Sequence, residues 1–194
     1  MSGALQPAPL GLGIPIDPAT PRVLLPLARA LQAVNRVAMA LGMLALLAAS
    51  VVLTYSVASR YFMKASTDWQ DEAAVFCLVG MTFLCGAFVQ SIRGHIGFEA
   101  ISSQLSAAAN RMRMVVIDFV SLAFCGFFAW KSWTLLHEAW VDGMTSSSSW
   151  APPLWIPYGL MSLGMSLLTV QLLVQLCASI NRVVNRTASG AEVH

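Results

Sequence analysis

The chain has 194 residues, of which 57% are hydrophobic and only 10% are charged, and its formal net charge is +2. A soluble globular domain carries about 25% charged residues, so this composition is typical of a membrane protein. The small net charge gives no basic surface of the kind that nucleic acids bind. We therefore expect the lipid bilayer to be the main surroundings of the chain and expect no nucleic-acid partner.

Uncharged segments predict four membrane-spanning helices. A helix of roughly 20 residues is about 30 Å long, which is the thickness of the hydrocarbon core of a bilayer. Residues 1–19 are rich in Pro, Gly and Ala, predict a disordered arm, and lack the basic start of a signal peptide. The membrane domain is expected over 37–182, with a tail over 183–194 and with spans at about 37–59, 73–92, 114–136 and 154–180.

Two further segments have the pattern of amphipathic helices that lie on a membrane surface. Over 98–113, apolar residues recur every third or fourth position and polar residues fill the rest of the helix surface. Over 20–36, arginines recur every seventh residue with leucines between them. Thr20-Pro21 predicts the start of this second helix, and Pro26 predicts a kink in it.

The positions of the charges predict the orientation. The N-terminal arm, the link between the second and third spans, and the tail each carry an excess of arginine, which predicts a cytoplasmic location. The link between the third and fourth spans carries Glu138 and Asp142 and is expected outside. The predicted fold class is thus an all-α membrane protein with four transmembrane helices, interfacial amphipathic helices and both termini cytoplasmic.

All six tryptophans fall on the outer side of this topology. An aromatic belt at the membrane surface accounts for such residues. A docking surface for an external partner is the alternative, because a simple belt would occupy both surfaces.

The first span carries a stripe of small residues, Ala38, Gly42, Ala45 and Ala49, along one face. Such a stripe allows a second helix to approach closely. The second helix belongs either to this chain or to another subunit.

Few residues carry candidate chemistry. The four cysteines all fall inside spans, and His95 and His137 fall at opposite ends of theirs, so neither a disulfide nor a shared haem is expected. Asp118 and Lys131 are the intramembrane charges. We interpret both as structural: Asp118 meets Arg111, Arg113 or a neighbouring helix, and Lys131 extends towards the outer surface. No catalytic residue, cofactor, metal ligand or enzyme activity is predicted.

Several motifs occur in a characteristic order. Arg60 ends the first span, Trp69 and Glu72 form W-x-x-E, and Gly94-His95-Ile96 is followed by Glu99. Gly143, the serines through Ser149, and Pro157 come before the last span. With this order on a four-helix frame, the chain resembles the small membrane subunit (Q-type) of tripartite ATP-independent periplasmic (TRAP) transporters, over roughly 35–182. Phe98-Glu99 stands where that family often has Val-Asp, and the N-terminal arm has no clear counterpart.

The resemblance implies a role in a complex of the bacterial inner membrane. Such a subunit is not catalytic and braces a large membrane subunit, which carries out sodium-driven uptake of an organic acid. A periplasmic solute-binding protein delivers that acid. Two alternatives remain open: a membrane anchor of a redox complex, and a small transporter that acts alone.

Candidate structural or partner-contact residues follow from position. We expect Arg60 to form a salt bridge with Asp71 and Glu72 that closes the outer hairpin, and expect Gly94, His95 and Glu99 to fix the turn after the second span. The links 60–72 and 138–153, which include Trp69 and Trp150, are the candidate face for the binding protein.

Overall fold

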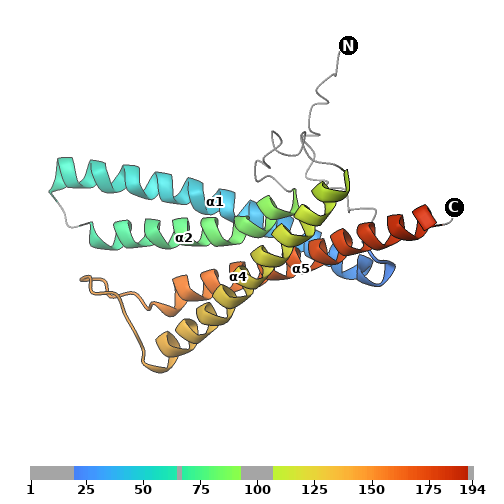
Figure 1. Cartoon of the computed structure of the whole chain (residues 1–194). Helices are drawn as coiled ribbons and strands as arrows, with labels where there is room; N and C mark the ends of the chain where they lie inside the picture. The colour runs from blue at the N-terminus through green and yellow to red at the C-terminus, as the bar shows by residue number, and fades with distance from the viewer. Residues whose placement is uncertain (1–19, 65–66, 93–106, 192–194) are drawn as a thin grey trace, which may run out of the picture.

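The computed structural model describes residues 20–64, 67–92 and 107–191, and these form four long helices (Figure 1). Each of the four is long and apolar enough to cross a membrane. The predicted all-α fold class with four transmembrane helices is therefore confirmed. The elements are a 3₁₀ turn η1 (Arg22–Leu24), α1 (Leu25–Met63), α2 (Asp68–Ser91), α4 (Ala107–Val141) and α5 (Trp155–Ala191).

Helix α1 differs from the prediction of two separate helices at 20–36 and 37–59. Residues 25–63 form one continuous helix. Pro26 stands in the first turn, where its missing N–H is not needed, so it starts the helix and does not kink it. No Gly or Pro lies near Arg36 to break the helix. The helix ends at Lys64, whose φ of 51° is left-handed.

The second predicted interfacial segment, 98–113, lies partly outside the described residues. Residues 107–113 form the first two turns of α4 and continue without a break into the third span. Helix α2 begins at Asp68, earlier than the predicted boundary at 73, because the acidic W-x-x-E segment is itself helical. That 98–113 and 20–36 lie on the membrane surface stays a prediction.

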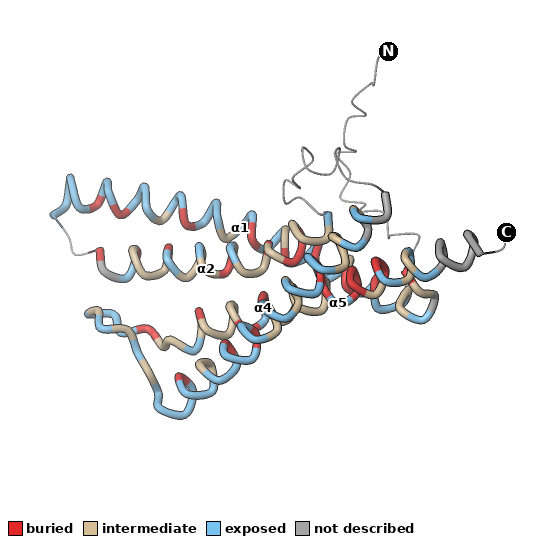
Figure 2. The backbone as a smooth tube through the Cα atoms, in the orientation of Figure 1, coloured by how far each residue is buried: buried red, intermediate tan, exposed pale blue. Residues whose placement is uncertain are grey.

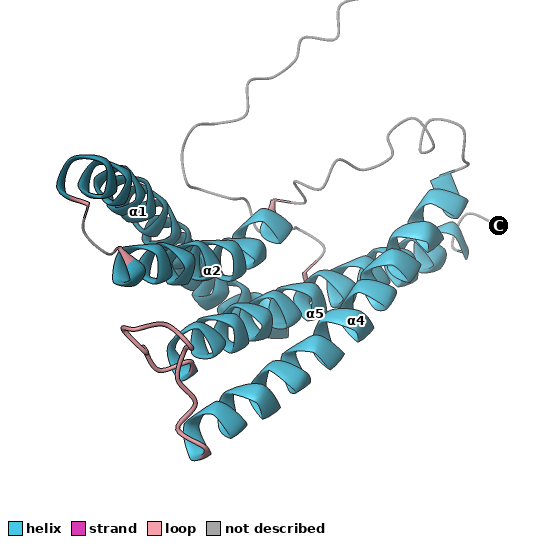
Figure 3. Ribbon diagram, turned by 90° about the vertical axis from the view of Figure 1, so that its left-hand side faces the viewer, coloured by secondary structure: helices cyan, strands magenta, loops and turns pink. Residues whose placement is uncertain are grey.

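The four helices run alternately up and down, so the start of α1 and the end of α5 lie at the same end of the molecule (Figure 1). Their main interfaces are α1 with α2, α2 with α5, and α5 with α4. The helices thus form an open layer in the order α1, α2, α5, α4, which fans out when viewed from the side (Figure 3). Helix α5 is the central element: 44% of its most apolar stretch is buried, against 11% for α4.

Two glycines let the helix axes come close. Gly42 of α1 faces Met81 and Cys85 of α2, so the small-residue stripe of the first span packs within this chain. Gly164 of α5 lies against the backbone of α2, and a Cβ added there would be 2.5 Å from the carbonyl carbon of Phe83. Backbone atoms cannot swing aside, so this contact admits only glycine.

A ladder of polar side chains joins α5 to each of the other helices. Gln171, Gln175 and Ser179 recur every fourth residue and so share one face of α5. Asn35 Nδ2 of α1 donates to Gln171 Oε1 over 3.1 Å. Ser179 Oγ donates to Asp118 Oδ2 of α4 over 2.7 Å.

The middle rung of this ladder pairs Gln175 with Gln90 of α2. Gln90 Nε2 donates to Gln175 Oε1 over 2.7 Å, and Gln175 Nε2 donates to the Gln90 carbonyl over 2.8 Å. Beside the ladder, Ala28 and Leu31 of α1 pack with Val174 of α5 in a small apolar cluster. Hydrogen bonds and close packing are the forces that hold helices together in lipid, and both act on α5.

We expect Gly164→Ala to separate α2 from α5 and destabilise the purified chain. Overpacking of this kind typically costs about 1–3 kcal/mol. The measurement is the thermal midpoint in detergent. Gly86→Ala is the matched control, because nothing lies within 4 Å of the position that its Cβ would take. Equal midpoints for the two variants would contradict the close approach.

The Gln90–Gln175 rung predicts coupling in a double-mutant cycle. Interhelical hydrogen bonds in membranes are each worth about 0.6 kcal/mol and at most about 1.7 kcal/mol. Unfolding in denaturing detergent should therefore give a coupling energy near 1 kcal/mol between Gln90→Leu and Gln175→Leu. Strictly additive effects would show that the two side chains do not depend on each other.

Candidate functional site

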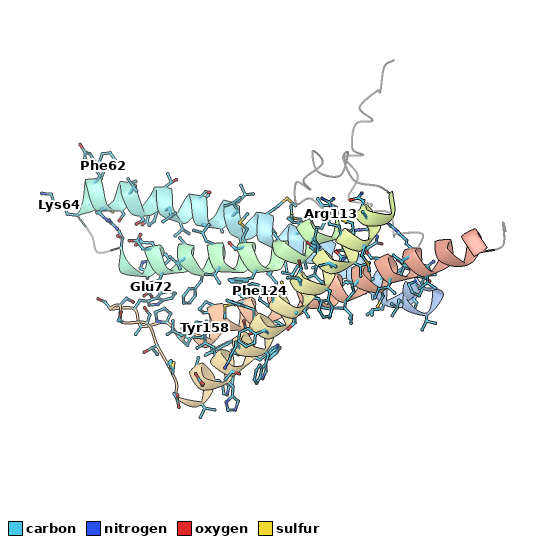
Figure 4. The ribbon with its side chains drawn as sticks, viewed as in Figure 1. Phe62, Lys64, Glu72, Arg113, Phe124 and Tyr158 are labelled. Atoms are coloured by element: carbon cyan, nitrogen blue, oxygen red, sulfur yellow. The ribbon has the colours of Figure 1, made fainter. Side chains whose placement is uncertain are left out.

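The predicted site residues that the structure describes gather mainly at one end of the layer. We define the loop end as the last turns of α1 and α4, the first turns of α2 and α5, and the link 142–154. Figure 4 shows Phe62, Lys64 and Glu72 at this end and Arg113 at the opposite end. The loop end carries the acidic residues Asp71, Glu72, Glu138 and Asp142.

Arg60 closes the hairpin between α1 and α2. Its Nη2 lies 2.8 Å from Asp71 Oδ2, and its Nε donates to Thr67 Oγ1 over 3.1 Å. Ser56, one turn earlier on α1, donates to the other carboxylate oxygen of Asp71 over 3.0 Å. The two charged side chains are 61% and 49% exposed, so in water this pair would contribute only about 0–1 kcal/mol.

The salt bridge expected of Arg60 is formed with Asp71, and Glu72 takes no part in it. Glu72 accepts a hydrogen bond from Ser146 Oγ of the link 142–154. Successive residues of a helix point about 100° apart, so Asp71 faces α1 while Glu72 faces the other side. Glu72 Oε2 is buried without a hydrogen-bond partner. Glu72 therefore connects the start of α2 with the link 142–154, whereas it was expected to help Arg60 close the hairpin between α1 and α2.

Two pairs of tryptophan rings also hold the loop end together. The rings of Trp69, in the first turn of α2, and Trp150, in the link 142–154, are 6.5 Å apart at 70°. The rings of Trp140 and Trp155, at the ends of α4 and α5, are 5.2 Å apart at 67°. All four rings stay substantially exposed. The loop end therefore presents a joined aromatic and acidic surface.

The link 142–154 has a defined backbone. Gly143 has a φ of 59°, a left-handed conformation that ends α4 in the way helices commonly end. Leu154 N–H then donates to the Met144 carbonyl over 2.9 Å, and Ser146 N–H donates to the Pro152 carbonyl over 3.0 Å. The link closes as a hairpin-like loop that holds Ser146 and Trp150 against α2.

The other predicted site residues lie elsewhere. Asp118 is 2% exposed in α4 and meets Ser179, so its predicted contact with a neighbouring helix is present. Lys131 is exposed on α4, with Nζ 5.2 Å from the centre of the Trp130 ring. Gly94, His95 and Glu99 fall outside the described residues, and the turn predicted for them stays a prediction.

Sequence reasoning missed the partners of these residues. Ser56, Thr67 and Ser146 each bind a predicted charged residue, and Gln70 is 4% exposed in the first turn of α2. Ser56 precedes Arg60 by one helical turn, which was a usable signal. Ser146 is 74 residues from Glu72, and no local pattern joins them.

The exposed aromatic and acidic side chains of the loop end are suited to binding. In residues 20–64, 67–92 and 107–191 no group of three or more His, Cys, Asp or Glu is placed to hold a metal ion. At the loop end, Arg60, Asp71 and Glu72 are engaged with one another or with hydroxyl groups, whereas Lys64, Glu138 and Asp142 are exposed. Figure 2 shows exposed residues along the outer faces of α1 and α4.

Comparison with known protein families gives a match over most of the chain. The model of the family described as "Tripartite ATP-independent periplasmic transporters, DctQ component" matches residues 49–182, which include the C-terminal part of α1, all of α2 and α4, and most of α5. No curated protein and no solved structure gives a significant match. Because the family model spans well over half of the chain and all four helices, this multi-pass membrane protein belongs to the DctQ family, the small membrane subunits of TRAP transporters.

Proposed function

We propose that the chain braces the large membrane subunit of a TRAP transporter during sodium-driven uptake of an organic acid. A periplasmic solute-binding protein delivers the acid, and the chain itself performs no catalysis. The observation that carries this proposal is the family match over 49–182. The family belongs to a three-part system, so a large subunit and a binding protein are the partners we assign to this chain.

The open layer of helices supports a bracing role. Exposed apolar side chains cover the outer face of α1, among them Val37, Leu44 and Val51, and also most of α4. Such broad surfaces are covered in the membrane by lipid or by another subunit. The polar groups inside the layer are used to join its own helices, which suits a rigid support better than a transport path.

We place the complex in the bacterial inner membrane with the loop end on the periplasmic side. Arginines concentrate at the opposite end, at Arg29, Arg36, Arg113 and Arg182, and the positive-inside rule assigns that end to the cytoplasm. The acidic and aromatic loop end is then the face that meets the binding protein. Aromatic residues are enriched in protein interfaces, which supports this assignment.

Affinity purification of the tagged chain from native membranes tests the proposal. We expect mass spectrometry to find one large multi-span protein at about a one-to-one ratio, as in an obligate complex. Adding the binding protein and a sodium gradient to liposomes that hold this pair should give uptake without ATP. Recovery of redox subunits, or of a stable oligomer of this chain alone, would overturn the proposal.

Glu72→Gln should lower both the yield of the complex and binding-protein-dependent uptake. The substitution keeps the shape of the side chain but weakens the bond to Ser146, since hydrogen bonds to charged groups contribute about 1.5–3 kcal/mol and neutral ones about 1 kcal/mol. Asp142→Asn is the matched control for the yield of the complex, because Asp142 is exposed at the same loop end and its substitution removes the same charge. Unchanged yield and uptake for Glu72→Gln would refute the importance assigned to this contact.

A further inference from the structure

The face of α4 that turns away from α5 carries an ordered set of groups that the bracing role does not use. Helix α4 packs on α5 through a stripe of buried and half-buried residues that includes Asp118, Ala129, Ser132 and Ala139. On the opposite face, Phe127, Trp130, Lys131, Thr134 and Glu138 are all exposed.

Two aromatic rings of this face lie beside the ammonium group of Lys131. The rings of Phe127 and Trp130 are 6.3 Å apart at 72°, and Lys131 Nζ is 5.2 Å from the centre of the Trp130 ring. No carboxylate of the described residues lies within ion-pair distance of Lys131. A charged ammonium group in the membrane is costly unless it is paired. Because Lys131 has no carboxylate partner in the described part of the chain, an anionic group of another molecule would stabilise it.

Charges along the face follow a fixed order towards the loop end. Thr134 lies about one turn beyond Lys131, and Glu138 lies about two turns beyond it, or roughly 10 Å along the axis. The Thr134 hydroxyl donates to the Trp130 carbonyl over 3.2 Å, which leaves its oxygen lone pairs as acceptors. The face thus presents a cation, then a neutral acceptor, then an anion.

We propose that this face binds a phospholipid with an ethanolamine headgroup. The lipid phosphate lies at Lys131, and the lipid ammonium group donates to Thr134 and Glu138. The acyl chains run along the exposed apolar residues Phe127, Phe124 and Val120. Lys and Glu are depleted in protein interfaces, so this pair of charges matches a zwitterionic headgroup better than another subunit. The proposal needs only that α4 crosses a membrane and is independent of the transport role.

Native mass spectrometry of the purified protein, with the subunits that accompany it, tests this site. The complex is titrated in detergent with phosphatidylethanolamine, phosphatidylcholine and phosphatidylglycerol of the same acyl chains. We expect the ethanolamine lipid to bind best, because choline cannot donate hydrogen bonds and glycerol carries no cation. Lys131→Gln should weaken its binding about tenfold, as expected for the loss of one charge-assisted hydrogen bond.

Two further variants separate the site from general charge effects. Glu138→Gln should abolish the preference for phosphatidylethanolamine over phosphatidylglycerol without weakening binding of the glycerol lipid. Lys64→Gln is the control, because Lys64 is an exposed loop-end cation away from this face, and it should bind all three lipids as the unchanged protein does.

Three results would overturn the proposal. The first is equal binding of the three lipids by the unchanged protein, and the second is unchanged binding after Lys131→Gln. The third comes from p-benzoylphenylalanine placed at Phe127 in cells, where crosslinking to a polypeptide in place of a lipid would show that a subunit covers this face.

Discussion

The polar ladder on α5 is the interaction on which the rest of the fold depends. In lipid the apolar side chains of two helices gain little by leaving the surrounding acyl chains, so apolar contact alone does not choose a neighbour. Side-chain amides and hydroxyls differ, because an unpaired one in hydrocarbon is costly. Gln171, Gln175 and Ser179 face α1, α2 and α4 in turn, and this gives each helix a place along α5.

The two ends of the layer are built by different means. Near the arginine-rich end, buried amides and a buried carboxylate bind across helices, where little water competes. At the loop end, the side chains of Arg60 and Asp71 are largely exposed, so their salt bridge contributes little to the stability of the hairpin. The loop end owes its shape instead to the contacts between links, namely Glu72 with Ser146 and Trp69 with Trp150. A core joined by buried hydrogen bonds, with a separately assembled surface at one end, agrees with the proposed bracing role.

The open order α1, α2, α5, α4 also distinguishes this chain from a self-contained helix bundle. A closed bundle would bury each helix against two neighbours, whereas α1 and α4 here pack mainly against one each. The face of α4 that turns away from α5 carries the exposed polar residues Lys131, Thr134 and Glu138, which can contact lipid or another subunit. The exposed faces agree with the proposed bracing role, since a support must offer surface to another subunit.

The sequence by itself determined the number of spans, their approximate limits, the small-residue stripe of α1 and the residues typical of the family, because length, charge and helical period are local properties. It also paired Arg60 with Asp71, which lie 11 residues apart on one hairpin. The tertiary structure alone decided that α5 is central, that Gly164 meets Phe83, and that Glu72 binds Ser146 and not Arg60. These features depend on the rotation of each helix about its axis and on which helices are neighbours. Contacts between residues far apart in the chain set both, and no local pattern records them.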